Sequence, residues 1–289
     1  MVLEKERDIL KIKAEKLSKL VTTPSANVKT KEPADVVTAS RDIHRLTTSE
    51  LAKLVCDVFY EMHGDRRYGD DGAIIGGVGM INGKAVTIVG TEKGHTVQEN
   101  IQRNFGSPHA EGYRKAIRLF QQAEKFRRPV ITIVNTSGAF CDVEAEDRGI
   151  GQAIAESMQT MATLTVPTIT ILMGEGGSGG ALALAVANKV WMMENAMYSV
   201  LSPEGFATIL WKDPSRVPEA AEYMKFTAPD LLDFKVIDQI IPENYSNRAL
   251  SHDELAIMIK DMLLTEIETQ EAMTPEDLLA AKEARFQQF

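Results

Sequence analysis

The segment 166–187 constrains the fold of this chain more than any other. It runs as VPTITILM, then the glycine-rich GEGGSGG, then ALALAVA. An apolar β-branched run, clustered glycines and an alanine- and leucine-rich run predict a strand, a loop and a helix in succession. The first turn of a helix leaves N–H groups without partners, and glycine lets a ligand approach the backbone closely. The residues from Gly176 to Gly180 are therefore predicted to present amide donors to an anion or a carbonyl-type oxygen.

One motif that fits this loop is the dinucleotide-binding fingerprint. Gly174, Gly176 and Gly179 have its spacing, and Glu194 lies at the distance of a ribose-binding acid. Such a site is expected at the first strand of a βαβ unit, near the start of its domain. This loop instead lies past the middle of the chain, with strand and helix patterns before it. The position of the loop disfavours a dinucleotide site.

The same residues also fit two acyl-chemistry motifs. Gly176-x-Ser178-x-Gly180 matches a nucleophile elbow, but a serine hydrolase needs a downstream acid and histidine, and His252 is the single histidine after Ser178. The other interpretation is an oxyanion site made by the amides of Gly179 and Gly180, with no side chain taking part. Tight packing of strand on helix explains one or two of the five glycines but is wasteful for all of them, because each costs backbone entropy.

Composition excludes several classes of function. The chain has 289 residues, of which 44% are hydrophobic, and this is enough for one domain or for one domain with an appendage. A net charge of −9 disfavours nucleic acid and anionic membranes as partners. Cys56 and Cys141 have no metal-binding spacing, and no apolar run approaches the roughly 20 residues that span a bilayer. We expect a soluble, cytoplasmic protein with no metal bound by this chain.

The first 90 residues begin with two segments outside the predicted core. Residues 1–20 predict an amphipathic docking helix, and 21–42 predict a linker. A capping box at 47–50 begins a helix whose apolar positions continue to Met62 and which Gly64 ends. The turn residues Asn82 and Gly83 then predict a β-hairpin between strands 73–81 and 84–90.

The next segments repeat the plan of the glycine-rich stretch. After a helix at 111–126, residues 129–139 form a proline-led strand and a small-residue loop, followed by a helix pattern at 144–164. Two such units in tandem predict a stacked spiral of strands and helices. Parallel neighbours place their loops at the same end of the sheet, so the amides of Gly138 or Ala139 should converge with those of Gly179 or Gly180.

The remaining chain is mostly helical in pattern. Strands are predicted at 189–193 and 198–201, and Ser202 caps a helix that runs to Trp211. Further helices are predicted at 218–234, 253–269 and 275–288, and the last two are heptad-like enough to predict packing on another subunit. We divide the chain into an N-terminal helix and linker (1–42), a main α/β domain (43–245) and a C-terminal helical extension (246–289).

Seven segments between Leu46 and Pro242 resemble the alpha subunit of bacterial acetyl-coenzyme A (acetyl-CoA) carboxylase carboxyltransferase. Such a run of motifs in one order is highly specific. The matching segments are His63-Gly-Asp-Arg66, Asp71-Gly-Ala-Ile-Ile-Gly-Gly77, Lys93-Gly94, Glu99-Asn100 with Arg103-Asn-Phe-Gly106, Glu111-Gly-Tyr-Arg-Lys115, Gly174-Glu-Gly-Gly-Ser-Gly-Gly-Ala181, and Tyr198-Ser-Val-Leu-Ser-Pro-Glu-Gly205 with Ile209-Leu-Trp-Lys212.

The resemblance implies a fold, a reaction and partners. The fold is an α/β crotonase-like spiral of repeated strand-strand-helix units with helical extensions at both ends. The reaction is transfer of a carboxyl group from carboxybiotin on a biotin carboxyl carrier protein to acetyl-CoA, which gives malonyl-CoA for fatty-acid synthesis. The partners are a zinc-carrying beta subunit in an alpha-two beta-two assembly, and biotin carboxylase in the larger complex.

The resemblance also assigns roles to the glycine loop. Carboxyl transfer develops negative charge on the ureido oxygen of biotin and on the thioester oxygen, so two oxyanion sites are needed. The resemblance places the biotin site on the catalytic amides of Gly179 and Gly180 and the thioester site in the beta subunit. The remaining predicted substrate-binding residues are Gly138, Ala139, Gly176 and Gly177. We expect Gly180→Val to cut turnover with the fold nearly intact, and Ser178→Ala to be mild because its hydroxyl caps the helix.

The segment 135–142 departs from the family pattern. It keeps Gly138 and Ala139 but lacks the usual proline and second glycine, which puts the rigidity of the loop and its fit to the usual substrate in question. A small buried filler is the preferred interpretation of Cys141 over a nucleophile. Neither His63 nor His95 has a metal-ligand neighbour at useful spacing. For Glu175 we prefer an anchor hydrogen-bonded to loop amides over a general acid.

We expect an enzyme subunit rather than a complete enzyme, because the chain lacks cysteine spacing for zinc and has no evident adenine or pantetheine motif. A structural or scaffolding partner is one alternative. The other is a free-standing enoyl-CoA hydratase or isomerase, which would need Glu175 as its acid or base. The choice between acetyl- and propionyl-CoA is left open, because acyl selectivity depends on the shape of the pocket.

Overall fold

The fold centres on one eight-stranded sheet in a computed structural model that describes residues 31–245 and 248–289. The order is β1-β2-β3-β4-β5-β6-β8, with β7 beside the end of β5. From β3 onward neighbouring strands run parallel, while β1, β2 and β3 are antiparallel. The strands are β1 (Val58–Glu61), β2 (Ile74–Ile81), β3 (Lys84–Thr91), β4 (Val130–Thr136), β5 (Thr168–Gly177), β6 (Lys189–Met193), β7 (Met197–Ser199) and β8 (Gln239–Ile241), and β9 (Asn244–Tyr245) pairs separately with β10 (Arg248–Ala249).

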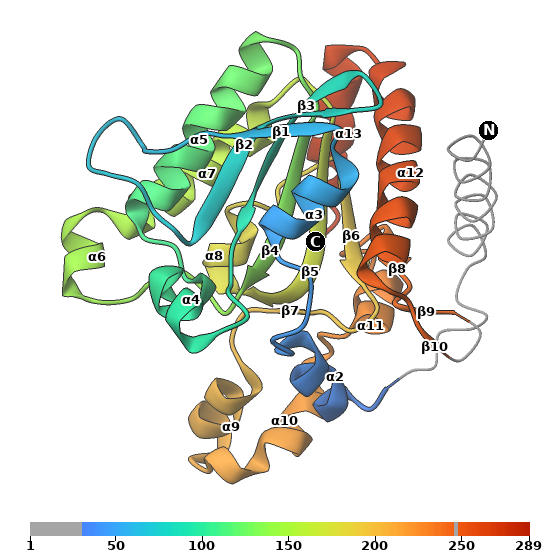
Figure 1. Cartoon of the computed structure of the whole chain (residues 1–289). Coiled ribbons are helices and arrows are strands. Elements are labelled where there is room, and N and C mark those ends of the chain that lie inside the picture. The colour runs from blue at the N-terminus through green and yellow to red at the C-terminus, as the bar shows by residue number, and fades with distance from the viewer. Residues whose placement is uncertain (1–30, 246–247) are drawn as a thin grey trace.

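Helices cover both faces of this sheet. The helical segments are α2 (Pro33–Ser40), α3 (Thr48–Val55), α4 (Val97–Gln102), η1 (Asn104–Gly106), α5 (Ala110–Lys125), α6 (Val143–Asp147), α7 (Ile150–Thr163), α8 (Ser178–Leu182), α9 (Pro203–Trp211), η2 (Pro214–Arg216), α10 (Val217–Met224), α11 (Ala228–Asp233), α12 (His252–Glu271) and α13 (Pro275–Phe286). Figure 1 shows α3 in front of the sheet and α5 and α7 behind it, with α12 along one side. α9 and α10 lie beyond the carboxyl ends of the strands, next to α2.

The first hairpin and the helix that follows it agree with the sequence prediction. β2 and β3 pair antiparallel around Asn82 and Gly83, whose φ angles of 49° and 80° are those of a type I′ turn. The helix expected at 111–126 is α5, and its apolar face is buried against β2, β3 and α7. In the hairpin and in α5, the structure predicted from local sequence is therefore the one that packs into the core.

The helix predicted to continue to Met62 is wrong beyond Val55. α3 begins at the predicted capping box, but Cys56 is extended and β1 follows. β1 pairs with β2, where Gly77 and Gly79 leave room for it: a Cβ at Gly77 would lie 2.1 Å from the Tyr60 carbonyl oxygen. Pairing with a glycine-bearing neighbour therefore outweighs the local helical periodicity.

Two predicted helices are each broken by a residue with positive φ. The pattern at 144–164 forms α6 and α7, separated by Gly149 with φ 77°. The pattern at 218–234 forms α10 and α11, because Lys225 adopts φ 52° and Thr227 caps a new helix. Local helical periodicity does not show these breaks, since the apolar spacing continues across them.

The two ends of the chain also differ from expectation. Part of the predicted linker 21–42 forms α2, which packs on α10, β5 and β7. The predicted helix at 1–20 lies outside the described residues. Buried apolar residues of α12, including Met258 and Ile259, belong to the main core of this chain, so this face of α12 packs within the chain. The packing of α12 and α13 on another subunit stays a prediction.

The glycine-rich segment 174–180 is more strand than loop. β5 continues to Gly177, where its end pairs with β7. α8 begins at the next residue and lasts five residues, after which 183–185 form a turn. The strand-loop-helix prediction is therefore correct in order, but the loop shrinks to a sharp corner and the helix is short.

Candidate active site

The loops that follow β4 and β5 meet in direct contact. Thr136 pairs with Gly176, which places both strand ends at the same edge of the sheet. A Cβ added at Gly180 would lie 2.4 Å from the Ala139 nitrogen, and one at Gly177 would lie 2.0 Å from the Ser137 carbonyl oxygen. The predicted convergence of these two loops is confirmed.

Three backbone amides at this contact have no partner among the turn, loop and cap hydrogen bonds of the described chain. They belong to Ala139, Gly179 and Gly180. The first turn of α8 supplies two of them, and no side chain caps its N-terminus. The Gly138 amide differs, because it donates to the Thr136 hydroxyl at 3.0 Å. The arrangement offers a short row of N–H donors to an oxyanion, and Gly138 supports the loop.

Close packing explains most of the glycines. A Cβ would come within 3.0 Å of other atoms at Gly174, Gly176, Gly177 and Gly180. Gly179 differs, since its added Cβ would meet only Ile154, at an ordinary 3.6 Å. The sequence argument that packing is wasteful for all five is therefore wrong for four of them. Gly179 is therefore the one glycine of the five where a Cβ makes no close contact, and this fits a surface that a ligand approaches.

Ser178 is exposed and lies at the corner between β5 and α8 with φ 52°. The prediction that its hydroxyl caps the helix is wrong, because the N-cap is Gly177 and no side-chain cap bond forms. Left-handed backbone at a strand-to-helix corner is also what a nucleophile elbow has. No hydrogen bond or ion pair in the described chain links Ser178 to a histidine, so the structure provides no base for it.

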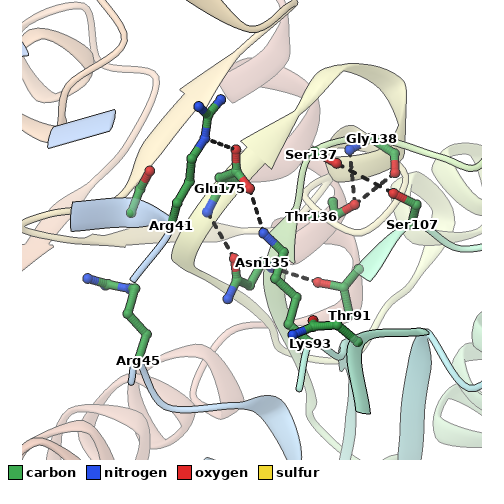
Figure 2. A network of polar contacts seen from close by, with 12 residues as sticks. Arg41, Arg45, Thr91, Lys93, Ser107, Asn135, Thr136, Ser137, Gly138 and Glu175 are labelled. Atoms are coloured by element: carbon green, nitrogen blue, oxygen red, sulfur yellow. Dashed lines mark hydrogen bonds and ion pairs between the residues drawn. The ribbon is translucent and has the colours of Figure 1, made fainter. Parts of the chain in front are cut away.

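Glu175 is held by two cations. Its Oε1 pairs with Arg41 Nε at 2.7 Å, and its Oε2 pairs with Lys93 Nζ at 2.5 Å (Figure 2). Burial alone would raise the pKa of Glu175, but the charges of Lys93 and Arg41 outweigh it and hold the pKa below its usual value. Glu175 is therefore an anchor, as predicted, although its partners are side-chain cations and not loop amides. A carboxylate kept ionised in this way is a poor general acid.

Backbone-to-side-chain bonds fix the strands below this anchor. The Glu175 amide donates to Asn135 Oδ1 at 3.1 Å, and the Asn135 amide donates to the Thr91 hydroxyl at 2.6 Å (Figure 2). The Gly174 position lies directly against the Asn135 side chain, where a Cβ would be 2.4 Å from Oδ1. β3, β4 and β5 are therefore cross-linked at the level where the amide row begins.

The departing loop 135–142 has its own supports. The Phe140 amide donates to the Pro108 carbonyl oxygen at 2.9 Å, and the Phe140 ring lies 4.3 Å from the His109 ring. Asp142 caps α6 through the Ala145 amide. These contacts take the place of the missing proline and glycine in holding the loop. Cys141 is exposed, so its interpretation as a buried filler is wrong.

The two histidines singled out in the sequence each contact a carboxylate. His63 Nδ1 lies 2.9 Å from Asp70, and His95 Nε2 lies 2.9 Å from Glu50. A hydrogen bond with the Ile43 carbonyl oxygen, reinforced by Glu50, raises the pKa of His95. No group of three or more histidine, cysteine, aspartate or glutamate side chains in residues 31–245 and 248–289 has the geometry to hold a metal ion.

Sequence reasoning missed two residues that support the site. Arg41 lies at the end of the predicted linker, and no local motif indicates its long-range pair with Glu175. Tyr113 is completely buried and donates its hydroxyl to the Gly180 carbonyl oxygen at 3.1 Å. The sole signal for Tyr113 was its place in one of the family-like segments.

Within the described residues, no helix is both long and apolar enough to cross a membrane.

Known proteins share this sequence along nearly its whole length. A family model described as acetyl co-enzyme A carboxylase carboxyltransferase-like matches residues 2–289. The chain belongs to this family. The carboxyl transferase subunit alpha of acetyl-coenzyme A carboxylase from Streptococcus thermophilus (strain ATCC BAA-491 / LMD-9) is 54% identical over 256 residues, which cover 89% of this chain and 98% of that protein. The corresponding subunit of Streptococcus sanguinis is 52% identical over 88% of this chain and 98% of its own length. These matches identify a carboxyltransferase alpha subunit and not a free-standing hydratase.

Solved structures confirm the crotonase-like fold of this alpha subunit. A transcarboxylase 12S structure with methylmalonyl-coenzyme A bound superposes with a TM-score of 0.65 at 17% identity, over 87% of this chain and 47% of that longer one. A chain of a Pseudomonas malonate decarboxylase hetero-tetramer gives 0.62 at 16% identity, over 80% of this chain and 91% of its own length. At such low identity these structures support the fold alone.

Proposed function

We propose that this subunit carries the biotin side of the reaction in which acetyl-CoA becomes malonyl-CoA. Carboxybiotin, borne on a separate carrier protein, supplies the carboxyl group. The amides of Gly179, Gly180 and Ala139 hold the negative charge that grows on the ureido oxygen of biotin as the carboxyl group departs. The observation that carries this proposal is the meeting of these three unpartnered amides at the ends of β4 and β5.

Preorganised amides are sufficient for such a role. Removing one oxyanion donor typically costs about 3 kcal/mol of barrier, or about 10²- to 10³-fold in rate. The donors here need no reorientation, because the Tyr113 hydroxyl and the β5 pairing fix the corner. The absence of a close contact at the Gly179 Cβ position suits a planar ureido group. In this proposal Gly138, Gly176 and Gly177 form the adjoining backbone of the substrate site.

The same proposal includes partners. A beta subunit with its own zinc site would complete an alpha-two beta-two enzyme in the cytoplasm and provide the thioester oxyanion site, and biotin carboxylase would load the carrier. Exposed apolar side chains just after β7 and on α9 support a protein partner: Val200, Ile209 and Leu210 are 78%, 67% and 58% exposed. The name subunit alpha, which the Streptococcus relatives carry, agrees with an assembly of more than one kind of subunit.

Variants at Gly179 and Ser178 test the amide site. The Cβ of Gly179→Val makes no close contact within the chain, so the variant should fold normally. A loss of turnover would then show that the added side chain blocks a ligand from reaching the amides. We expect kcat and kcat/KM to fall together by about tenfold or more, because the lost interaction belongs to the transition state. Ser178→Ala is the matched neighbour and should retain near-normal turnover.

The assay uses the chain assembled with its partner subunit, with free biotin or carboxylated carrier as the second substrate. An inactive Ser178→Ala beside a near-normal Gly179→Val would contradict the amide site and favour a serine nucleophile.

A further inference from the structure

We propose that Arg41 is a positioning residue for carboxyl transfer, which acts through Glu175 to hold the first turn of α8 in place. This inference rests on the proposed amide site and adds to it a residue from the N-terminal segment. Arg41 touches neither the amide row nor, by this account, the substrate. Its role is to fix the strand end from which the row begins.

The contacts of Arg41 join three separate parts of the chain. Its Nε donates to Glu175 at 2.7 Å, and its Nη1 and Nη2 donate to the two carboxylate oxygens of Glu204 at 2.7 and 3.2 Å. Arg41 ends α2, Glu175 lies in β5 and Glu204 lies in the first turn of α9. A planar guanidinium is well suited to such a shared grip, because its N–H groups point in fixed directions.

Glu175 transmits this grip to the amide row. It directly precedes Gly176 and Gly177, and Gly177 is the N-cap of α8. The carboxylate is mostly buried, with 9% of its side chain exposed. Losing a cation beside a buried carboxylate leaves charge poorly compensated, and the strand end then relaxes or the carboxylate takes up a proton.

Other charged groups around Glu175 define what Arg41 alone contributes. Lys93, from the segment between β3 and α4, is the second cation. Its aliphatic stem packs against Gly106, where an added Cβ would lie 2.7 Å from the Lys93 Cγ. Arg45 donates to the neighbouring Met173 carbonyl oxygen and is neutralised by Glu243 at 2.9 Å. Glu204 is the second carboxylate that pairs with Arg41. Tyr198, which is partly buried and packs against Gly176, stays neutral because burial raises its pKa to about 12.

The environment of Glu175 predicts a pH signature for Arg41 variants. With both cations present, Glu175 stays ionised across the pH range of the assay. The acid limb of the plot of kcat against pH therefore lies at low pH. Without Arg41, only Lys93 opposes the effect of burial, so the pKa of Glu175 should rise and the acid limb should move to higher pH. A residue that merely stabilises the fold would lower the amount of active enzyme without moving this limb.

Three variants in the assembled enzyme test the inference: Arg41→Gln, Arg41→Lys and the control Arg248→Gln. Arg248 is itself exposed and pairs at 2.6 Å with the buried carboxylate of Glu254 in the first turn of α12, so it matches Arg41 in type of contact but lies on another element. We expect Arg41→Gln to lower kcat about tenfold with KM for the carrier unchanged, and to shift the acid limb. Arg41→Lys should restore most of the rate, and Arg248→Gln should resemble wild type.

Hydrogen exchange of the peptide 174–182 separates failure of this inference from failure of the amide site. Positioning by Arg41 predicts faster exchange of these amides in Arg41→Gln and not in Arg248→Gln. Unchanged exchange, or an unmoved acid limb together with reduced kcat, overturns the role of Arg41. Faster exchange with undiminished turnover supports Arg41 as the support of the corner but contradicts the catalytic role of the amides.

Discussion

Ser178 stores strain at the corner that starts the amide row. A φ of 52° costs a residue with a Cβ about 1 kcal/mol relative to glycine. We therefore expect Ser178→Gly to raise the free energy of unfolding by at most about 1 kcal/mol, since the added freedom of the unfolded chain offsets part of the gain. Urea unfolding checks this against Gln159→Gly. That control lies on the exposed face of α7 and should destabilise by about 1 kcal/mol. Equal destabilisation by both changes would show that Ser178 is not strained.

Gly179 and Gly180 are adjacent but face different surroundings. A Cβ at Gly180 would lie 2.4 Å from the Ala139 nitrogen and 2.9 Å from the Tyr113 hydroxyl. This contact corrects the sequence-based expectation that Gly180→Val leaves the fold intact, because the backbone of the opposite loop must move. We expect Gly180→Ala to cost about 1–3 kcal/mol of stability and Gly179→Ala less than about 1 kcal/mol. Thermal unfolding of the two variants side by side checks this, and equal melting temperatures would contradict it.

At the scale of elements, Lys282 joins α13 to the end of α7. Its buried ammonium donates to the Met161 and Leu164 carbonyl oxygens at 2.9 and 3.0 Å. Burial lowers the pKa of Lys282 from 10.5 to about 8. Between these two values the unfolded chain binds the proton and the folded chain does not, so this residue makes stability rise with pH from about 8 to 10.5.

The Lys282→Met variant isolates this effect. Wild type should gain at most about 1.4 kcal/mol of unfolding free energy per pH unit from Lys282 in that range, and the variant should lose this slope. Urea unfolding at several pH values measures it, with the exposed Lys53→Met as control. A slope that persists in Lys282→Met would place the titrating group elsewhere.

Local pattern was enough to predict some elements and not others. The hairpin at Asn82 and Gly83 and the helix α5 follow from turn chemistry and periodicity, which act within a few residues. β1 does not, because its strand conformation depends on pairing with β2, which carries Gly77 and Gly79. The apolar run 58–61 forms a strand and not a helix because it pairs with β2, which is distant in sequence.

The candidate site shows the same division. The amides of Gly179 and Gly180 could be predicted from the glycine cluster and helix start alone. Arg41 could not, because it reaches Glu175 across 134 positions of sequence from a segment with linker-like composition. Long-range ion pairs have no sequence period, so no local pattern can reveal them.

At the scale of the whole molecule, the exposed apolar residues of α9 predict dependence on a partner. We expect Leu210→Asp to weaken assembly with the beta subunit at least about tenfold while the isolated chain remains folded, since the side chain is 58% exposed here. Phe126→Asp is a matched control: its ring is 57% exposed and lies before β4, at the opposite end of that strand from the amide row. Analytical ultracentrifugation measures assembly, and equal binding by both variants would remove α9 from the interface.

Partner dependence extends to catalysis. The chain alone should show no carboxyl transfer to acetyl-CoA, and activity should appear when the beta subunit is added in equal amount. Full activity of the isolated chain would contradict the assignment of the thioester oxyanion site to a partner.

The central claim is that a backbone N–H, and not a side chain, stabilises the departing biotin. Replacing Gly179 with glycolic acid converts its amide to an ester and removes this one donor with little change in shape. In the assembled enzyme we expect kcat to fall about 10²- to 10³-fold. Lactic acid in place of Ala185, whose amide bonds to the Leu182 carbonyl oxygen, is the matched control and should leave kcat near normal. A Gly179 ester that turns over as fast as the Ala185 ester would contradict the account.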